Sequence, residues 1–298
     1  MSEDRWWHAR ERGAPLAVAF MRWAALSLGR RTARSLLYPI TAYFYLTAPD
    51  VRRASRRFLT RVRGHQASWW EVAVHIHTFS ATILDRTYFL AGRHDVFDVA
   101  VHGAAGIDEL LRGGRGCVMA GAHVGSFEAL RAVAVQQRHL PVKVLMHHDQ
   151  NGTLQRILDA INEEVARTII PLGRSDSMLA AGHALQTGHL VGMLADRVDG
   201  SAKVTCCRLL GGDVMLPAGA VHLAALFGVP LVFCVCLYRG GNRYEIFFER
   251  LAEHIPGDRY RREEETRKWM QAYANRLEHY VRLAPYNWFN FYDYWHEA

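Results

Sequence analysis

The stretch that decides the fold runs from residue 116 to residue 128: Gly116-Cys117-Val118-Met119-Ala120-Gly121-Ala122-His123-Val124-Gly125-Ser126-Phe127-Glu128. Its apolar first part predicts a short buried strand, and the glycines near its end predict a tight turn. Ser126 is a residue type that often caps a helix, so we expect a helix to begin there. A histidine at the mouth of such a strand points into the crevice where open α/β sheets hold their ligands.

His123 and Glu128 are therefore the candidate catalytic residues. Glu128 would lie in the first helical turn, where its carboxylate can fold back and accept a hydrogen bond from one imidazole nitrogen. The other nitrogen would be free to take a proton from a hydroxyl group. A histidine and a glutamate at this spacing also occur by chance, and the alternative is a surface histidine beside a helix-start glutamate.

The remainder of the chain alternates strand-like apolar runs with helical patterns. Strands are predicted near residues 97–101, 116–121, 142–147, 168–171, 190–195, 204–210, 230–238 and 243–250. Helices are predicted near residues 106–112, 126–138, 152–165, 175–187, 217–227 and 258–283. This alternation predicts an α/β fold with a mostly parallel mixed sheet flanked by helices. Asp196 and Arg197 follow one strand, so parallel pairing would bring them to the same sheet edge as His123.

The positive charge is concentrated near the N-terminus. Residues 1–63 hold 13 arginines and no lysine against four acidic residues, a formal charge of +9, whereas the rest of the chain carries −2. Such a segment predicts an anionic partner, either a membrane surface, an acidic carrier protein or nucleic acid. Because long apolar runs separate these arginines, the pattern argues against nucleic acid.

The same N-terminal region is also apolar. Residues 14–28 would form a helix of roughly 22 Å, shorter than the roughly 30 Å hydrocarbon core of a bilayer, so we expect it to lie in one leaflet. A second apolar patch follows at residues 36–47. We therefore predict a membrane-associating helical segment over residues 1–64 and an α/β domain over residues 65–298. The alternative is an N-terminal layer that packs on the protein's own core.

Two further helices are predicted after these patches. Between Pro49 and Gly64, arginines recur at helical spacing and form a stripe. This stripe is either a solvated face or a docking surface for phospholipid headgroups or for an acidic carrier protein. Residues 68–90 form a second amphipathic pattern, in which His75 is expected to be a core or surface residue rather than a ligand.

The five cysteines, which lie mostly in apolar strand-like runs, predict reduced thiols rather than a disulfide framework. Neither they nor the histidines have the spacing of a zinc site, so we predict no metal. No cofactor is predicted either.

The order of these features resembles the bacterial lipid A late acyltransferases, within the lysophospholipid and glycerolipid acyltransferase superfamily. The resemblance is carried by the Trp- and Arg-rich N-terminal segment, the His-x4-Glu motif of His123 and Glu128, Asn151-Gly152, the run from Leu194 to Gly200, and Pro217-Ala218-Gly219-Ala220. It implies an O-acyltransferase that moves a fatty acyl group from acyl carrier protein, or from coenzyme A, to a hydroxyl of a lipid or glycolipid. The expected location is the cytoplasmic face of the bacterial inner membrane, as a peripheral or monotopic protein.

The resemblance and the strand-end positions together give the candidate substrate-binding residues: Asp196, Arg197, Asn151, Arg174, Gly125, Ser126, Pro217 and Gly219. Arg197 suits a phosphate or a developing oxyanion, to which backbone amides near Gly125 could also donate. Ser126 is not expected to be a nucleophile, because the chain lacks the Gly-x-Ser-x-Gly elbow there.

The acceptor stays open in the sequence. The family acts on lipid A precursors, other glycolipids and acceptors linked to aryl polyene pigments. Many members have an arginine near the end of the strand at 142–147, where this chain has His147 and His148. Two functions of other classes also remain open. A metal-dependent hydrolase could use His123, Glu128, His147 and His148, and a non-catalytic anionic-lipid-binding protein would need only the N-terminal arginines.

Overall fold

The computed structural model describes residues 23, 25–146, 167–198, 203–258 and 260–295. Its main sheet has seven strands in the order β1-β9-β8-β2-β5-β3-β4. They are β1 (Asp98–His102), β2 (Cys117–Gly121), β3 (Val142–Met146), β4 (Ile169–Pro171), β5 (Leu190–Leu194), β8 (Leu231–Tyr238) and β9 (Arg243–Ala252). All neighbours pair in parallel except β8 and β9. The predicted α/β fold with a mostly parallel mixed sheet is confirmed.

A separate two-stranded hairpin departs from the prediction. β6 (Val204–Leu209) pairs with β7 (Gly212–Pro217) in antiparallel register, outside the main sheet. The sequence reading had no strand at β7. Leu210 and Gly211 both have positive φ angles, of 50° and 76°, which is the backbone of a two-residue hairpin turn. That turn reverses the chain and pairs β6 with its neighbour in sequence.

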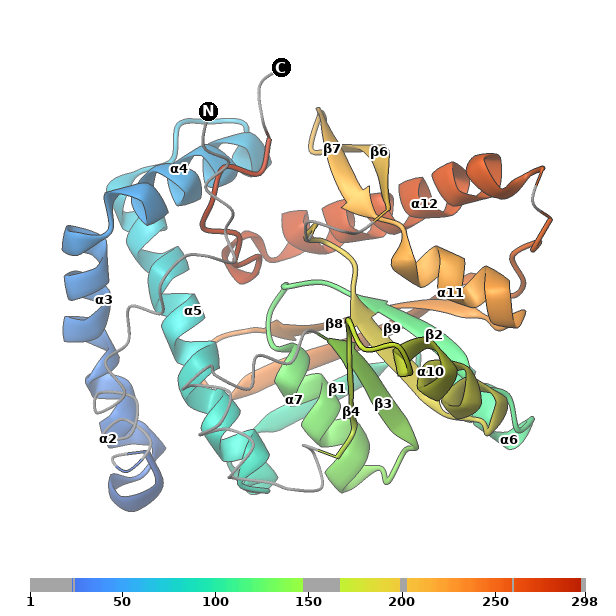
Figure 1. Cartoon of the computed structure of the whole chain (residues 1–298). Helices are drawn as coiled ribbons and strands as arrows, with labels where there is room; N and C mark the ends of the chain where they lie inside the picture. The colour runs from blue at the N-terminus through green and yellow to red at the C-terminus, as the bar shows by residue number, and fades with distance from the viewer. Residues whose placement is uncertain (1–22, 24, 147–166, 199–202, 259, 296–298) are drawn as a thin grey trace.

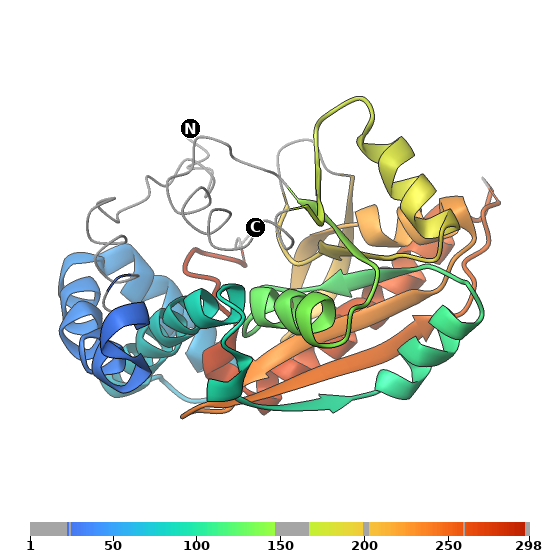
Figure 2. The same cartoon turned by 90° about the horizontal axis from the view of Figure 1, so that it is seen from below.

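Helices cover both faces of the sheet. They are α6 (Ala104–Arg112), α7 (Phe127–Ala132), α10 (Ser177–Gln186), α11 (Gly219–Phe227) and α12 (Arg262–Leu283), and α7 continues as a π-helical turn at Val133–Gln137. Along β2, Val118 and Ala120 join the core beneath α10, α11 and α12, whereas Cys117 and Met119 join the core beneath α6 and α7. β2 is therefore apolar on both faces, as expected for a central parallel strand. Figure 2 shows α7 in front of the sheet and α12 behind it.

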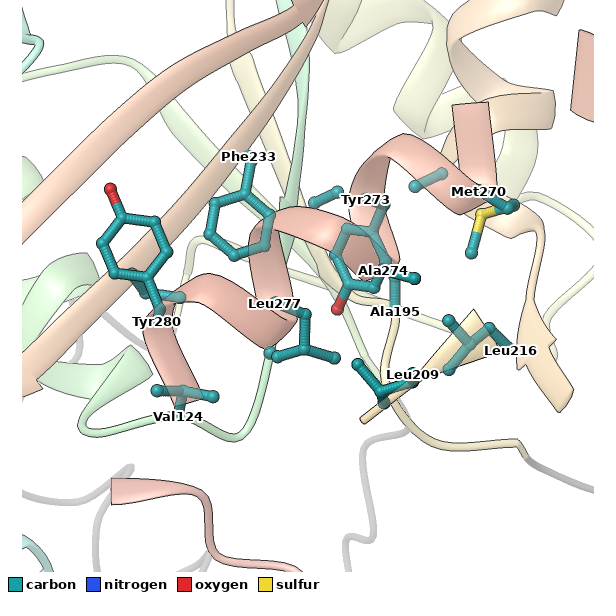
Figure 3. Packing of buried hydrophobic residues seen from close by; sticks show 14 of the residues in the cluster. Val124, Ala195, Leu209, Leu216, Phe233, Met270, Tyr273, Ala274, Leu277 and Tyr280 are labelled. Carbon is teal, nitrogen blue, oxygen red and sulfur yellow. The ribbon is translucent and has the colours of Figure 1, made fainter. Parts of the chain in front are cut away.

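The C-terminal helix α12 packs against one face of the sheet. Tyr273, Leu277 and Tyr280 face the sheet and contact Phe233 of β8 and its neighbours (Figure 3). The rings of Phe233 and Tyr280 stack with their centroids 5.6 Å apart. This packing fixes α12 beneath β8, and the chain continues from α12 into the C-terminal tail.

Four N-terminal helices lie together at one end of the sheet (Figure 1). They are α2 (Arg30–Ser35), α3 (Leu37–Thr47), α4 (Pro49–Arg63) and α5 (Trp69–Leu90). α4 buries Phe58, Leu59 and Val62 in the main core and leaves Arg53, Arg56 and Arg57 exposed. Most of the predicted apolar helix at residues 14–28 lies outside the described residues. Within the described residues, no helix combines the length and apolarity needed to cross a bilayer.

Candidate active site

His123 lies two residues beyond the end of β2, at the carboxyl edge of the parallel strands. β2 and β5 pair in parallel with Gly121 opposite Leu194, so Asp196, two residues beyond β5, lies beside His123. The Nδ1 atom of His123 is 2.8 Å from Oδ1 of Asp196, and the backbone N–H of His123 donates to Oδ2 at 2.9 Å. The prediction that Asp196 shares the edge of His123 is confirmed.

Asp196 is completely buried and fully hydrogen-bonded. Besides His123, its Oδ2 atom accepts the indole N–H of Trp288 at 3.0 Å, and its backbone oxygen accepts the hydroxyl of Tyr294 at 2.6 Å. Burial alone would raise the pKa of Asp196, but the nearby His123, its hydrogen bond and the charge of Arg197 outweigh burial and lower that pKa to about 2. Asp196 is therefore an anion at any pH near neutrality.

The ring of His123 is arranged as a base. Burial lowers its pKa below the ordinary value of 6.5, and Arg197 adds to this effect while Asp196 opposes it. The ring is consequently neutral at pH 7, with a proton on Nδ1 that is donated to Asp196. About 30% of the side chain remains exposed, and no described residue hydrogen-bonds to Nε2. Nε2 is thus free to accept a proton from a bound hydroxyl group.

The predicted hydrogen bond between His123 and Glu128 is wrong. Glu128 forms ion pairs with Arg86 of α5 at 2.9 Å and with Arg131, one turn further along α7, at 2.6 Å. Burial would raise the pKa of Glu128, but the two guanidinium groups outweigh it and hold that pKa below the usual value. Glu128 is therefore bound by two cations that tie α7 to α5, and Asp196 occupies the place expected for it beside the imidazole.

Replacing Glu128 with glutamine should destabilise the protein. The change removes the carboxylate from Arg131, whose side chain is only 2% exposed, and loss of the charged partner of a buried ion typically costs about 3–5 kcal/mol of unfolding free energy. The loss should be greatest above pH 4.5, because a carboxylate with a lowered native pKa stabilises the fold above its unfolded pKa and ceases to do so as it protonates.

Glu263→Gln is the matched control for thermal or denaturant unfolding. Glu263 is 90% exposed and pairs with Arg267 at the surface, so its loss should cost less than about 0.5 kcal/mol. Equal unfolding midpoints for the two variants would contradict the structural role assigned to Glu128.

Gly125 and Ser126 shape the turn after His123. Gly125 has a φ of 68°, and an added Cβ would collide with the carbonyl oxygen of Cys236. Its own N–H donates to the backbone oxygen of Asn287 at 2.7 Å, so this amide is already engaged, and the role of other backbone amides near Gly125 toward an oxyanion stays a prediction. The Oγ of Ser126 accepts the N–H of Ala129 at 3.1 Å, which confirms the predicted helix cap.

The structure brings together only part of the predicted substrate-binding set. Arg197 is half-buried and donates to the Oδ1 of Asn290 at 2.9 Å and to the backbone oxygen of Phe289 at 2.7 Å. Arg174 is exposed and pairs with Asp176. No described contact joins Arg174 to the His123–Asp196 pair.

The remaining predicted substrate-binding residues are Pro217 and Gly219, which the structure describes, and Asn151, which it does not. Pro217 ends β7 and Gly219 begins α11, where a Cβ on Gly219 would come within 3.0 Å of the methyl carbon of Met193. Asn151, His147 and His148 lie outside the described residues. Among those that are described, no three His, Cys, Asp or Glu side chains are grouped to hold a metal ion. All five cysteines are unbridged.

Sequence reasoning missed the role of the C-terminal tail. The tail closes the body against solvent, with Trp288, Phe289 and Trp295 buried. Its contacts with His123 and Asp196 were not predicted. The density of aromatic residues signalled burial, but nothing in the local sequence identified the strand end against which the tail packs.

One comparison with known proteins identifies the family. A model of the bacterial lipid A biosynthesis acyltransferases matches residues 8–297. A search of curated proteins gave no match. The His-x4-Glu motif and the α/β fold agree with the family match. Because the family model covers nearly the whole chain, this chain belongs to the bacterial lipid A biosynthesis acyltransferase family.

Proposed function

We propose that this acyltransferase moves a fatty acyl group from an acyl thioester directly to a hydroxyl of a lipid or glycolipid acceptor, with His123 as the general base. The family supports an acyl donor and a lipid acceptor. The observation that carries the assignment of the base is the 2.8 Å contact of Nδ1 with Asp196, which leaves Nε2 as the free basic nitrogen. We further propose acyl carrier protein as the donor, with coenzyme A as the second choice.

The reaction needs one proton to move twice. As the hydroxyl oxygen of the acceptor bonds to the thioester carbon, Nε2 of His123 takes the hydroxyl proton, and Asp196 stabilises the imidazolium that forms. The tetrahedral intermediate then collapses: the carbon–sulfur bond breaks, and the sulfur leaves as a thiol with the proton from Nε2. The positive charge of Arg197, close enough to lower the pKa of His123, would also stabilise the oxyanion. No acyl-enzyme is required.

The proposed reaction is tested by incubating the purified protein with acyl carrier protein or coenzyme A thioesters and candidate lipid acceptors. Mass spectrometry should show the acceptor heavier by one acyl group, with one thiol released for each ester formed. Trapping of a covalent acyl-enzyme, or release of free fatty acid without acylated lipid, would contradict direct transfer. Lipids from a deletion strain, compared with those of its parent, would identify the acceptor.

We also propose that the protein works at the cytoplasmic face of the inner membrane, held there by its N-terminal helices. α3 and α5 lie side by side and run in opposite directions (Figure 1), and the Tyr38 and His77 rings stack between them at 5.0 Å. The end of α3 and the start of α5 expose large apolar side chains, with exposed fractions of 72% for Leu46, 63% for Trp69 and 62% for Trp70. Helix α4, which follows α3 along the chain, exposes arginine side chains. Exposed apolar side chains together with exposed arginines suit binding to an anionic lipid surface.

The membrane proposal predicts the behaviour of a Trp69→Ser/Trp70→Ser double variant. Removing two interfacial aromatic side chains should weaken binding to anionic vesicles by about tenfold in a sedimentation assay at low salt. Leu179→Ser is the control, because Leu179 is 77% exposed but lies on α10, away from this surface. Equal binding by the double variant and the control would remove this surface from the membrane contact.

A further inference from the structure

The C-terminal tail is fastened directly to the loop that carries His123. Asn287 binds both the backbone N–H and the backbone oxygen of Tyr238 at the end of β8, at 2.7 and 3.1 Å. Its own backbone oxygen accepts the N–H of Gly125. The N–H of Phe289 donates to the backbone oxygen of His123 at 3.0 Å, and Trp288 forms an antiparallel bridge with Val124. The tail is therefore one wall of the site.

Trp288 is the residue of this wall that reaches Asp196. Its side chain is completely buried, and its indole N–H and the backbone N–H of His123 both donate to Oδ2 of Asp196. Two donors on one oxygen fix the rotation of the carboxylate and leave Oδ1 to face Nδ1 of the imidazole. The indole thus acts on the reacting histidine through the carboxylate.

The backbone of Trp288 is held from the opposite side by two N-terminal helices. Nε2 of His75, on α5, lies 3.0 Å from the backbone oxygen of Trp288, and Nδ1 of His75 lies 2.8 Å from the hydroxyl of Ser55 on α4. Burial lowers the pKa of His75 to about 4, so this ring is neutral at pH 7. It can then donate to Trp288 from Nε2 while Nδ1 accepts the Ser55 hydroxyl. The ring of Phe58 packs edge-on against the indole at 5.2 Å.

We propose that Trp288 is a positioning residue for acyl transfer, because its indole N–H orients Asp196 and thereby holds His123 in the tautomer that has a free Nε2. The role of Trp288 in catalysis rests on the proposed function. Its effect on the geometry of the His123–Asp196 pair does not, and that effect can be measured without substrate.

The other charged and titratable groups around the His123–Asp196 pair could contribute to an observed titration of His123. Arg197 lies close enough to both members for its charge to lower the pKa of each. The hydroxyls of Tyr273, Tyr292 and Tyr294 surround Asp196, and burial raises the pKa of each above its ordinary value. Asp196 is already ionised at neutral pH and His75 titrates near pH 4, so the ring resonances of His123 itself are followed to observe its protonation.

The test compares Trp288→Phe with Trp295→Phe. Both changes remove one indole N–H from a buried tryptophan of the same tail, but Trp295 donates to the backbone oxygen of Leu209 rather than to Asp196. In Trp288→Phe, Asp196 loses a donor and offers more of its charge to the imidazolium. The pKa of His123, followed by NMR, should therefore rise relative to wild type, and kcat should fall by about tenfold with KM within about twofold. Trp295→Phe should leave that pKa unchanged.

A measurement on the wild-type protein covers the case in which Trp288→Phe does not fold. With ¹⁵N-labelled indoles, the Nε1–H resonance of Trp288 should shift as His123 titrates, and that of Trp295 should not. If the two resonances respond alike, or if the pKa of His123 is unchanged or falls in Trp288→Phe, the positioning role is overturned. If the NMR responses appear but no acyl transfer occurs in wild type, the positioning stands and the proposed reaction fails.

Discussion

His123→Gln is expected to lower kcat for acyl transfer by at least about 10²–10⁴-fold, the usual contribution of a positioned general base. Glutamine occupies a similar volume and can still hydrogen-bond to Asp196, so the site should remain folded. Its amide cannot take the hydroxyl proton, and the barrier therefore rises in the chemical step while binding of the donor and the acceptor changes little. Steady-state kinetics with separate kcat and KM values check this expectation.

His254→Gln is the control, because His254 is exposed and is far along the chain from the site. It should retain wild-type rates. A His123→Gln protein within tenfold of wild type would show that another group is the base.

The pH profile of wild type follows from the same residue. Because burial holds the pKa of His123 below 6.5, kcat/KM should fall in acid with a midpoint below pH 6.5, as the native ring becomes protonated. In the unfolded chain the ring takes up its proton near pH 6.5, so the contribution of His123 to stability decreases as the pH falls below that value. A midpoint at or above pH 6.5 would contradict the lowered pKa.

Asp196→Asn is expected to lower kcat by roughly 10³–10⁴-fold, because an isosteric amide reverses the tautomer of the histidine. The position of Oδ2 receives two N–H donors, from His123 and Trp288, and must therefore be filled by the amide oxygen. The amide NH₂ then faces Nδ1 of His123 and donates to it. The imidazole proton moves to Nε2, which can no longer act as a base.

The ¹⁵N chemical shifts of the His123 ring at neutral pH report this change directly. They should show the proton on Nδ1 in wild type and on Nε2 in Asp196→Asn. Asp213→Asn is the control, since Asp213 is 67% exposed in its pair with Arg208 and should change neither rate nor shifts. A slow Asp196→Asn enzyme with an unchanged tautomer would mean that charge, and not orientation, is what Asp196 supplies.

Most of the fold follows from periodicity and order along the chain. The strands around Met119, Val144 and Val191 were predicted because each is a short apolar run between turn residues. The helices around Ile76 and Leu277 were predicted because apolar residues recur at helical spacing, and the helix around Phe58 because arginines do. β7 was missed because its pairing depends on the backbone of Leu210 and Gly211, and the positive φ of a leucine is not evident from composition.

The site was predicted in part for the same reason. Parallel strands end at one edge, so the residues just after β2 and β5 had to lie near each other, and His123 and Asp196 do. The partner of His123 was assigned to the nearer carboxylate in sequence. Glu128 is instead bound by Arg86, which is 42 residues away in the chain, and local spacing carries no information about such a contact.

The sequence by itself determined the strand that delivers His123 to the sheet edge, the helix that begins at Ser126, and the neighbourhood of Asp196, because these depend on local apolar patterns and on the rule that parallel strands share an edge. Only the tertiary structure decided which carboxylate orients the imidazole and that Trp288 closes behind it. Those contacts depend on where two separate segments, α5 and the C-terminal tail, pack when their apolar faces are buried. Residues brought together by such packing share no spacing along the chain from which their contact could be read.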